Sequence, residues 1–158
     1  MEFNKLYREY YRSIYTFAYR MTGDSNYAMD ITQETFLKLY NYLNESNTIV
    51  NPRAWLYRVA ANISNNQLNR NSIFDRIIKI IRFDSHYSDI ESSLINMEEK
   101  FLVKKALEKL SKRDRTILQL YQDGLSYDEM AEVMKIKKTA IGKTLSRAIE
   151  KCNRHIER

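Results

Sequence analysis

The side chains best suited to bind a polyanion lie in residues 126–148. An S-x-x-E capping box at Ser126 opens a short helix, and a corner at Lys135–Lys137 leads into a longer helix with apolar Ile141 and Leu145 on one line. The donor side chains on the other faces of this second helix are Lys137, Lys138, Thr139, Lys143, Ser146 and Arg147. Because such donors suit phosphates and base edges in a major groove, the pattern predicts a DNA-binding helix-turn-helix.

Ala131, in the middle of the short helix, supports this interpretation. A bulky side chain there would hold apart two helices that cross steeply near their turn. The unpaired N–H groups at the start of the Ser126 helix also suit a phosphate. The alternative is an ordinary helical hairpin with a Lys-rich exterior, but the cap, the corner and the charge together favour DNA binding.

The helix predicted over Pro52–Arg70 carries a line of unusual composition. Asn51 is suited to cap it and Pro52 to begin it. Its predicted buried line is Leu56, Val59, Ala60 and Ile63, and a second line at 3-4-3-4 spacing is Trp55, Arg58, Asn62, Asn65 and Asn69. A ring that stacks and amides that hydrogen-bond suit single-stranded bases. Alternatively, Trp55 belongs to the core and the Asn residues reflect an Asn-rich chain; the residues alone leave both interpretations open.

A third group of polar side chains lies on the helix predicted over residues 26–43. Asp30, Gln33 and Glu34 share the face opposite its buried line. An acidic patch on an otherwise basic chain indicates a contact with protein and not with nucleic acid.

Catalytic and metal-binding groups are scarce in this chain. One Cys and two His in 158 residues argue against a disulfide scaffold and a protein-only zinc site, and Cys152 continues an apolar stripe. No acid–base or nucleophile–base cluster is evident, since His86 falls in a predicted linker and His155 near the end. We therefore expect a protein that is not an enzyme and that has no metal and no cofactor.

The charge is unevenly distributed. The chain has a net charge of +6, and residues 100–158 hold 15 basic against 8 acidic side chains, a balance of +7. Residues 84–99 hold five acidic side chains and no Lys or Arg. This asymmetry favours an anionic partner for the C-terminal part.

Helical periodicity dominates the rest of the sequence and predicts an all-α fold of two small helical domains joined by a flexible linker. We place a first helical domain at residues 1–70, the linker at 71–98 and a second helical domain at 99–158, with helices expected at 2–21, 26–43, 52–70, 97–110, 111–121, 126–134 and 138–152. Neither a leader nor a membrane-spanning run is visible, so we expect a cytoplasmic protein without membrane insertion.

Four motifs in this order resemble the bacterial RNA polymerase sigma factors of the extracytoplasmic-function class. They are Asp30-x-x-Gln33-Glu34-Thr35-Phe36; Arg53-Ala54-Trp55-Leu56-Tyr57-Arg58-Val59-Ala60-Ala61-Asn62; Gly124-Leu125-Ser126-Tyr127-Asp128-Glu129-Met130-Ala131; and Leu145-Ser146-Arg147-Ala148. The resemblance covers nearly the whole chain. It implies a sigma-2-like domain, a linker and a sigma-4-like helix-turn-helix domain.

The resemblance also implies roles by position. Asp30, Gln33, Glu34 and Phe36 match the segment that binds core polymerase at its clamp. The loop Asn44–Asn51 and the line Trp55, Arg58, Asn62, Asn65 and Asn69 match the region that opens the minus-10 element and holds a flipped base. Ser126, Tyr127 and the donors from Lys137 to Arg147 match the reader of the minus-35 element, and Asp84–Glu99 matches a linker that lies in the polymerase cleft.

Several positions depart from the family pattern. Lys135 stands at the corner where Gly is usual, so we expect a left-handed backbone there. Gly142 and Thr144 replace basic residues of the recognition helix, and Gly142 weakens that helix. Asn66 and Asn69 also depart from the pattern. We expect weak DNA binding by the second domain alone.

The expected function is transcription initiation: the chain binds core RNA polymerase, recognises the minus-35 and minus-10 elements of promoter DNA and assists melting. The resemblance also implies an anti-sigma factor as a partner, for which the apolar run Ile73–Phe83 is a hypothetical contact. The alternative is a stand-alone helix-turn-helix regulator of transcription whose N-terminal domain dimerises or binds a ligand. That alternative predicts a symmetric operator.

Overall fold

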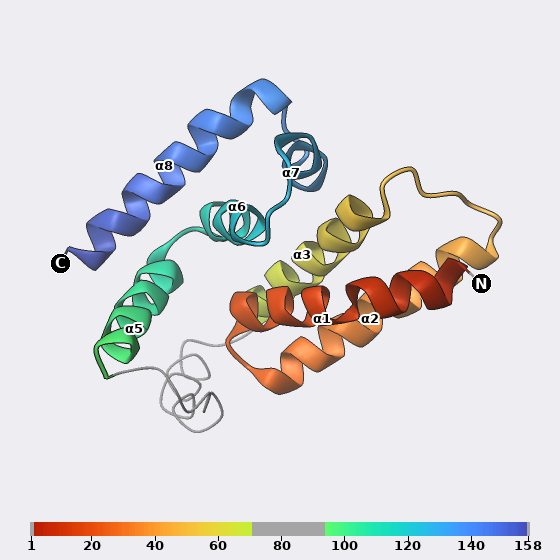
Figure 1. The fold of residues 1–158 in the computed structure, drawn as a ribbon, viewed down its shortest axis with the longest axis horizontal. Coiled ribbons are helices and arrows are strands. Elements are labelled where there is room, and N and C mark those ends of the chain that lie inside the picture. The colour runs from red at the N-terminus through yellow and green to blue at the C-terminus, as the bar shows by residue number, and fades with distance from the viewer. Residues whose placement is uncertain (1, 71–93, 158) are drawn as a thin grey trace.

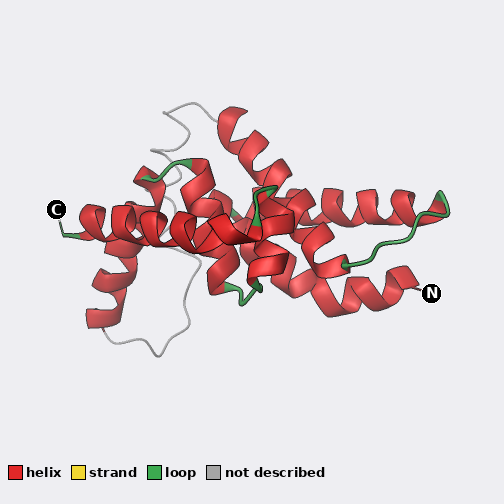
Figure 2. Ribbon diagram, turned by 90° about the horizontal axis from the view of Figure 1, so that it is seen from above, coloured by secondary structure: helices red, strands yellow, loops and turns green. Residues whose placement is uncertain are grey.

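The computed structural model describes residues 2–70 and 94–157, which form seven α-helices and no strand (Figure 1). The N-terminal domain consists of α1 (Glu2–Thr22), α2 (Ser25–Asn44) and α3 (Pro52–Arg70). The C-terminal domain consists of α5 (Leu94–Lys109), α6 (Lys112–Gln122), α7 (Tyr127–Met134) and α8 (Lys138–Ile156). The second view shows the described residues as red helices with green loops and no strand between them (Figure 2). The predicted all-α fold of two helical domains is confirmed.

The break between α1 and α2 lies at Gly23 and Asp24. Gly23 has a positive φ of 70°, which a residue without Cβ adopts at no steric cost. Asp24 then caps α2, since its Oδ1 accepts hydrogen bonds from the backbone N–H groups of Asn26 and Tyr27. The aromatic side chains of α1 are only partly buried, since Tyr7 is exposed while Leu6 and Phe17 enter the core.

The helix α3 is buried on more than one side. Asn51 caps it as predicted, its Oδ1 accepting from the N–H of Ala54 at 3.1 Å. Leu56 and Ala60 of the predicted buried line are fully buried, whereas Val59 and Ile63 are only half-buried. Further buried residues of α3 are Ala54, Tyr57, Ala61 and Ser64. The predicted line therefore covers only part of the buried surface, because α3 contacts α1 and α2 on one side and α6 and α7 on the other.

The C-terminal domain begins earlier than predicted. The helix α5 starts at Leu94 and not at Met97, because residues 94–99 contain no Pro or Gly to stop it. The predicted linker 71–98 therefore loses its last five residues to α5, and its remainder, which includes Ile73–Phe83, lies outside the described residues. Ser111 caps α6 by accepting from the N–H of Asp114 at 3.1 Å.

The two domains pack against each other. Contacts join α3 to α7, α1 to α6 and α3 to α6, and Figure 1 shows α7 and α6 beside α3. Buried apolar side chains of both domains form one continuous cluster, from Leu6 in α1 to Ala148 in α8. We refer to this packing of the C-terminal domain on α1 and α3 as the closed arrangement.

A smaller apolar cluster lies within the C-terminal domain. It consists of Ala106 and Leu110 of α5 and Cys152 of α8. Burial raises the pKa of the Cys152 thiol, which makes it a poor nucleophile and agrees with a packing role. In the two described ranges, no helix has the length and apolar character needed to cross a bilayer.

Candidate nucleic-acid interface

The helices α7 and α8 meet at a corner with well-defined caps. Ser126 Oγ accepts from the N–H of Glu129 at 3.2 Å, and Glu129 Oε2 accepts from the N–H of Ser126 at 2.8 Å, so the predicted capping box is present. Lys135 then ends α7 in the left-handed region with φ 54° and ψ 44°, which confirms the expectation for this position. A non-glycine residue in that conformation costs about 1 kcal/mol.

The apolar sides of α7 and α8 hold the two helices together. Met130 and Ile141 are fully buried, Val133 and Leu145 nearly so, and Ala131 is half-buried against the same cluster. This packing fixes the rotation of α8 about its axis. The opposite side of α8 is therefore directed to solvent.

The predicted donors lie on that outer side. Lys137, Lys138, Thr139, Lys143, Ser146 and Arg147 are all exposed. Lys138 is paired with Asp128 at 3.1 Å, but both side chains are more than half exposed, so the pair is weak and readily exchanged for a phosphate contact. Ser126 and Tyr127 are exposed at the start of α7. The structure thus assembles one convex, basic helix face of a size that enters a major groove.

The predicted minus-10 residues on α3 do not form one uniform face. Trp55 is half-buried and its ring lies 5.5 Å from that of Tyr42, so it contacts the core without being enclosed in it. Asn62 is exposed and Arg58 is half-buried, both within reach of an outside partner. Asn65 instead faces the C-terminal domain, where its Nδ2 lies 3.4 Å from Thr116 Oγ1.

The predicted minus-10 region also includes Asn69 and the loop between α2 and α3. The Asn69 side chain is outside the described residues. The loop between α2 and α3 extends away from the C-terminal domain, and its Val50 is fully exposed (Figure 1). The loop therefore lies away from the contacts between the domains, whereas Asn65 takes part in them.

The predicted polymerase-binding residues on α2 are likewise partly exposed and partly buried. Asp30, Gln33 and Glu34 are exposed, and Glu34 pairs with Lys38 at 3.8 Å. Phe36 is only 2% exposed and packs against the ring of Tyr7 at 4.9 Å. The prediction of a direct polymerase contact by Phe36 is therefore corrected to a core role. It is the exposed apolar side chains Met29 and Leu37 that flank the polar group.

A cluster between the domains is absent from the sequence predictions. Arg20 of α1 and Tyr57 of α3 both donate to the carboxylate of Asp123, at 2.6 and 2.8 Å. Burial, followed by the Asp123 charge, raises the pKa of the Tyr57 hydroxyl, so it stays a donor at neutral pH. No local pattern indicates these contacts, since the residues are far apart in the sequence.

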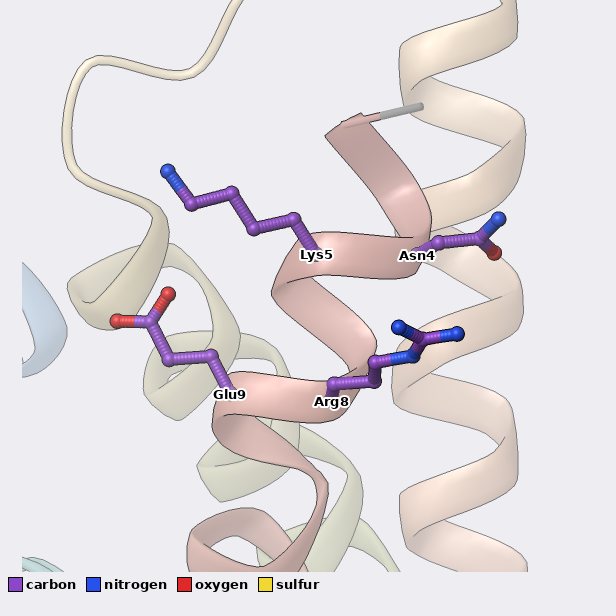
Figure 3. Close-up of a pocket in the computed structure, with 4 residues that line it drawn as sticks. All are labelled: Asn4, Lys5, Arg8 and Glu9. Atoms are coloured by element: carbon purple, nitrogen blue, oxygen red, sulfur yellow. The ribbon is translucent and has the colours of Figure 1, made fainter.

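The described residues offer no comparable site for a small ligand or a metal ion. Asn4, Lys5, Arg8 and Glu9 line a surface hollow on α1, but all four are exposed, and Lys5 and Glu9 project to one side while Asn4 and Arg8 project to the other (Figure 3). Within residues 2–70 and 94–157, no three potential metal ligands gather.

Comparison with known proteins agrees with this arrangement. Residues 6–73 match the family model of sigma-70 region 2, and residues 100–152 match that of sigma-70 region 4. The RNA polymerase sigma factor YlaC of Bacillus subtilis is 28% identical over 148 residues, covering 90% of this chain and 85% of YlaC. The ECF RNA polymerase sigma factor SigW of the same organism is 28% identical over 138 residues, covering 80% of this chain and 74% of SigW.

A solved structure shares the fold over the full length. The sigma factor RpoE, determined in complex with the anti-sigma factor NepR from Bartonella quintana, superimposes with a TM-score of 0.72 at 21% identity. The match covers 99% of this chain and 97% of that chain.

Gly142 gives a prediction about the stability of the recognition helix. A Cβ at Gly142 would lie 3.9 Å from Cε2 of Tyr127, an ordinary contact, and Gly inside a helix is unfavourable. We expect Gly142→Ala to raise the free energy of unfolding by about 0.5–1 kcal/mol, measured by urea denaturation.

Gly124→Ala is the matched control for this substitution. Gly124 also has open space around it, but its φ is +75°, so the added Cβ is expected to destabilise the protein by about 1 kcal/mol. A loss of stability in Gly142→Ala would contradict the description of α8 as a continuous helix at this point.

Proposed function

Because this chain belongs to the sigma-70 family, in its extracytoplasmic-function group, we propose that it binds core RNA polymerase and directs it to promoters. The observation that carries the proposal is the basic outer face of α8, presented by the capped corner at Ser126 and Lys135. The region 2 and region 4 models match in the order that a sigma factor requires. This order favours the proposal over a stand-alone regulator.

In the proposed mechanism, the C-terminal domain reads the minus-35 element as duplex. The outer face of α8 enters the major groove, where Lys143 and Arg147 donate to phosphates or guanine edges. The N-terminal end of α7 contacts the flanking DNA backbone with the N–H group of Tyr127, since that of Ser126 donates to Glu129 Oε2. The N–H groups of the first turn are oriented by the cap, so little ordering is required on binding.

The N-terminal domain acts on the minus-10 element as single strands. Half-buried Trp55 and Arg58 lie on the same helix as exposed Asn62, and the loop with Val50 lies at the start of that helix. Extruding a base costs a few kcal/mol, which stacking and amide hydrogen bonds offset. The protein therefore melts DNA by binding the separated strand and not by catalysis.

Partners and location follow from this role. Asp30, Gln33 and Glu34 on α2 bind a protein surface of core polymerase, with Met29 and Leu37 supplying apolar contact. The RpoE relative was solved with an anti-sigma factor, and a similar partner is proposed for this chain. The protein acts in the cytoplasm, where the polymerase and the promoter are.

The direct test of the proposed function uses purified protein and core polymerase. We expect the two to co-elute and to give run-off transcripts from a promoter that core polymerase alone does not use. A chain that does not associate with core polymerase would rule out the proposal. A symmetric operator bound by a dimer would instead support the stand-alone regulator.

Lys143→Ala tests the duplex-reading face. If Lys143 meets a phosphate, its loss should weaken binding to a minus-35 duplex and reduce the slope of log K against log salt by about one. Lys109→Ala, which removes the same charge from the exposed end of α5, is expected to leave the slope unchanged. Equal slopes for all three proteins would exclude Lys143 from the interface.

Asn62→Ala tests the melting face. We expect unchanged duplex binding and weaker promoter opening, seen as lower permanganate reactivity of minus-10 thymines in the complex with polymerase. Asn4→Ala, an exposed Asn of α1 outside this face, is the control. Normal reactivity in Asn62→Ala would remove this residue from the site.

A further inference from the structure

The turn between α6 and α7 adds polar contacts to the apolar cluster that both domains share in the closed arrangement. The Asp123 carboxylate accepts from Arg20 Nη1 at its Oδ1 (2.6 Å) and from the Tyr57 hydroxyl at its Oδ2 (2.8 Å). The Asp123 side chain is 9% exposed and the Tyr57 hydroxyl reaches it from the core, whereas the Arg20 side chain is 36% exposed and meets it from the solvent side. One acidic group of the C-terminal domain is thus bound by two helices of the N-terminal domain.

Arg53 extends the same contact along the backbone of the turn. Its Nη2 donates to the carbonyl oxygen of Asp123 at 2.8 Å, and its Nη1 lies 3.4 Å from both the carbonyl oxygen of Gly124 and Oε2 of Glu129. Glu129 is also the capping-box residue of α7. The first domain therefore holds the start of the helix-turn-helix itself.

A second patch of contacts lies between α3 and α6. Lys112 Nζ donates to the carbonyl oxygen of Asn65 at 3.1 Å, and Asn65 Nδ2 lies 3.4 Å from Thr116 Oγ1. In this patch the fit is imperfect, because Asn65 Oδ1 is buried without a hydrogen-bond partner in the described structure. An unpaired buried polar atom makes the closed arrangement easier to separate.

The closed arrangement is incompatible with the proposed reading of a promoter. The minus-35 and minus-10 elements are about 25 base pairs apart, which is roughly 85 Å of duplex at 3.4 Å per pair. Two domains in direct contact, as Arg20 and Asp123 are at 2.6 Å, cannot bind both promoter elements at once. In addition, Asn65 of the predicted minus-10 set is occupied by Thr116. The covalent length of residues 71–93, at most about 75 Å, lets the domains separate without unfolding.

We propose that Asp123, together with Arg20, Arg53 and Tyr57, forms an interdomain latch that keeps the free chain closed and must open when the chain engages core polymerase. The inhibitory effect of the latch rests on the proposed function, whereas the contacts that form the latch do not. Closure reduces the population that is competent to bind polymerase, so it reduces the apparent affinity by the same factor. The chain is therefore autoinhibited until polymerase binding opens it.

The test weakens the latch from each side. Asp123→Asn removes the charge while keeping a residue that tolerates the turn, and Tyr57→Phe removes one donor while keeping the buried ring. Glu108→Gln, an exposed acid of α5, is the matched control for the change in charge. Circular dichroism checks that all variants keep their helices.

Two measurements are made on the full chain. Small-angle X-ray scattering without polymerase should show a larger radius of gyration for Asp123→Asn and Tyr57→Phe than for the wild type. Titration with core polymerase should show tighter binding, on the order of tenfold for Asp123→Asn and less for Tyr57→Phe. Glu108→Gln should match the wild type in both measurements.

The outcomes separate the latch from the proposed function. An unchanged radius of gyration in both latch variants overturns the latch. Expansion without tighter polymerase binding overturns its inhibitory role. A wild-type chain that binds core polymerase but gives no transcripts contradicts the proposed function, and the scattering comparison still decides whether the latch exists.

Discussion

The Asp123 carboxylate, together with the apolar cluster that both domains share, determines how the two domains are arranged. An ionised group that is 9% exposed must receive hydrogen bonds, and Arg20 and Tyr57 supply them from another domain. This requirement fixes which turn of the C-terminal domain faces the N-terminal domain. It also explains why the hydroxyl of a fully buried tyrosine is directed out of its own domain.

The same requirement makes α3 a shared element. One side of the helix packs on α1 and α2 and another on α6 and α7, while Trp55 and Asn62 remain accessible to a partner. A helix that packs against two sets of helices and also leaves side chains accessible to a partner cannot have one apolar stripe and one charged face. Its Asn-rich, weakly amphipathic sequence is the physical result, and the buried hydroxyl of Ser64 shows that polar atoms occur inside the packing as well.

Local signals in the sequence predicted local structure well. The caps at Asn51 and Ser126 and the left-handed Lys135 each depend on residues within a few positions, and all are present. The outward direction of the α8 donors also followed from one apolar line. What failed was long-range: Phe36 is buried by aromatic rings of α1, and the contact of Arg20 with Asp123 spans 103 positions. Burial by another helix has no signature within a single helix, so neither could be predicted.

The departures in the recognition helix acquire a meaning when the two domains are considered together. A left-handed Lys135 and a helix-interior Gly142 each cost about 1 kcal/mol of folding stability at the corner between α7 and α8, and weak DNA binding by the C-terminal domain alone stays a prediction. Two weak readers on one chain bind tightly only when both engage the same DNA, because the second then binds at a high effective concentration. Under the proposed function, a closed arrangement that prevents simultaneous engagement would remove this gain in affinity. Weak binding by each reader would then allow the interdomain interface, with its shared apolar cluster and the polar contacts of Asp123, to control DNA binding.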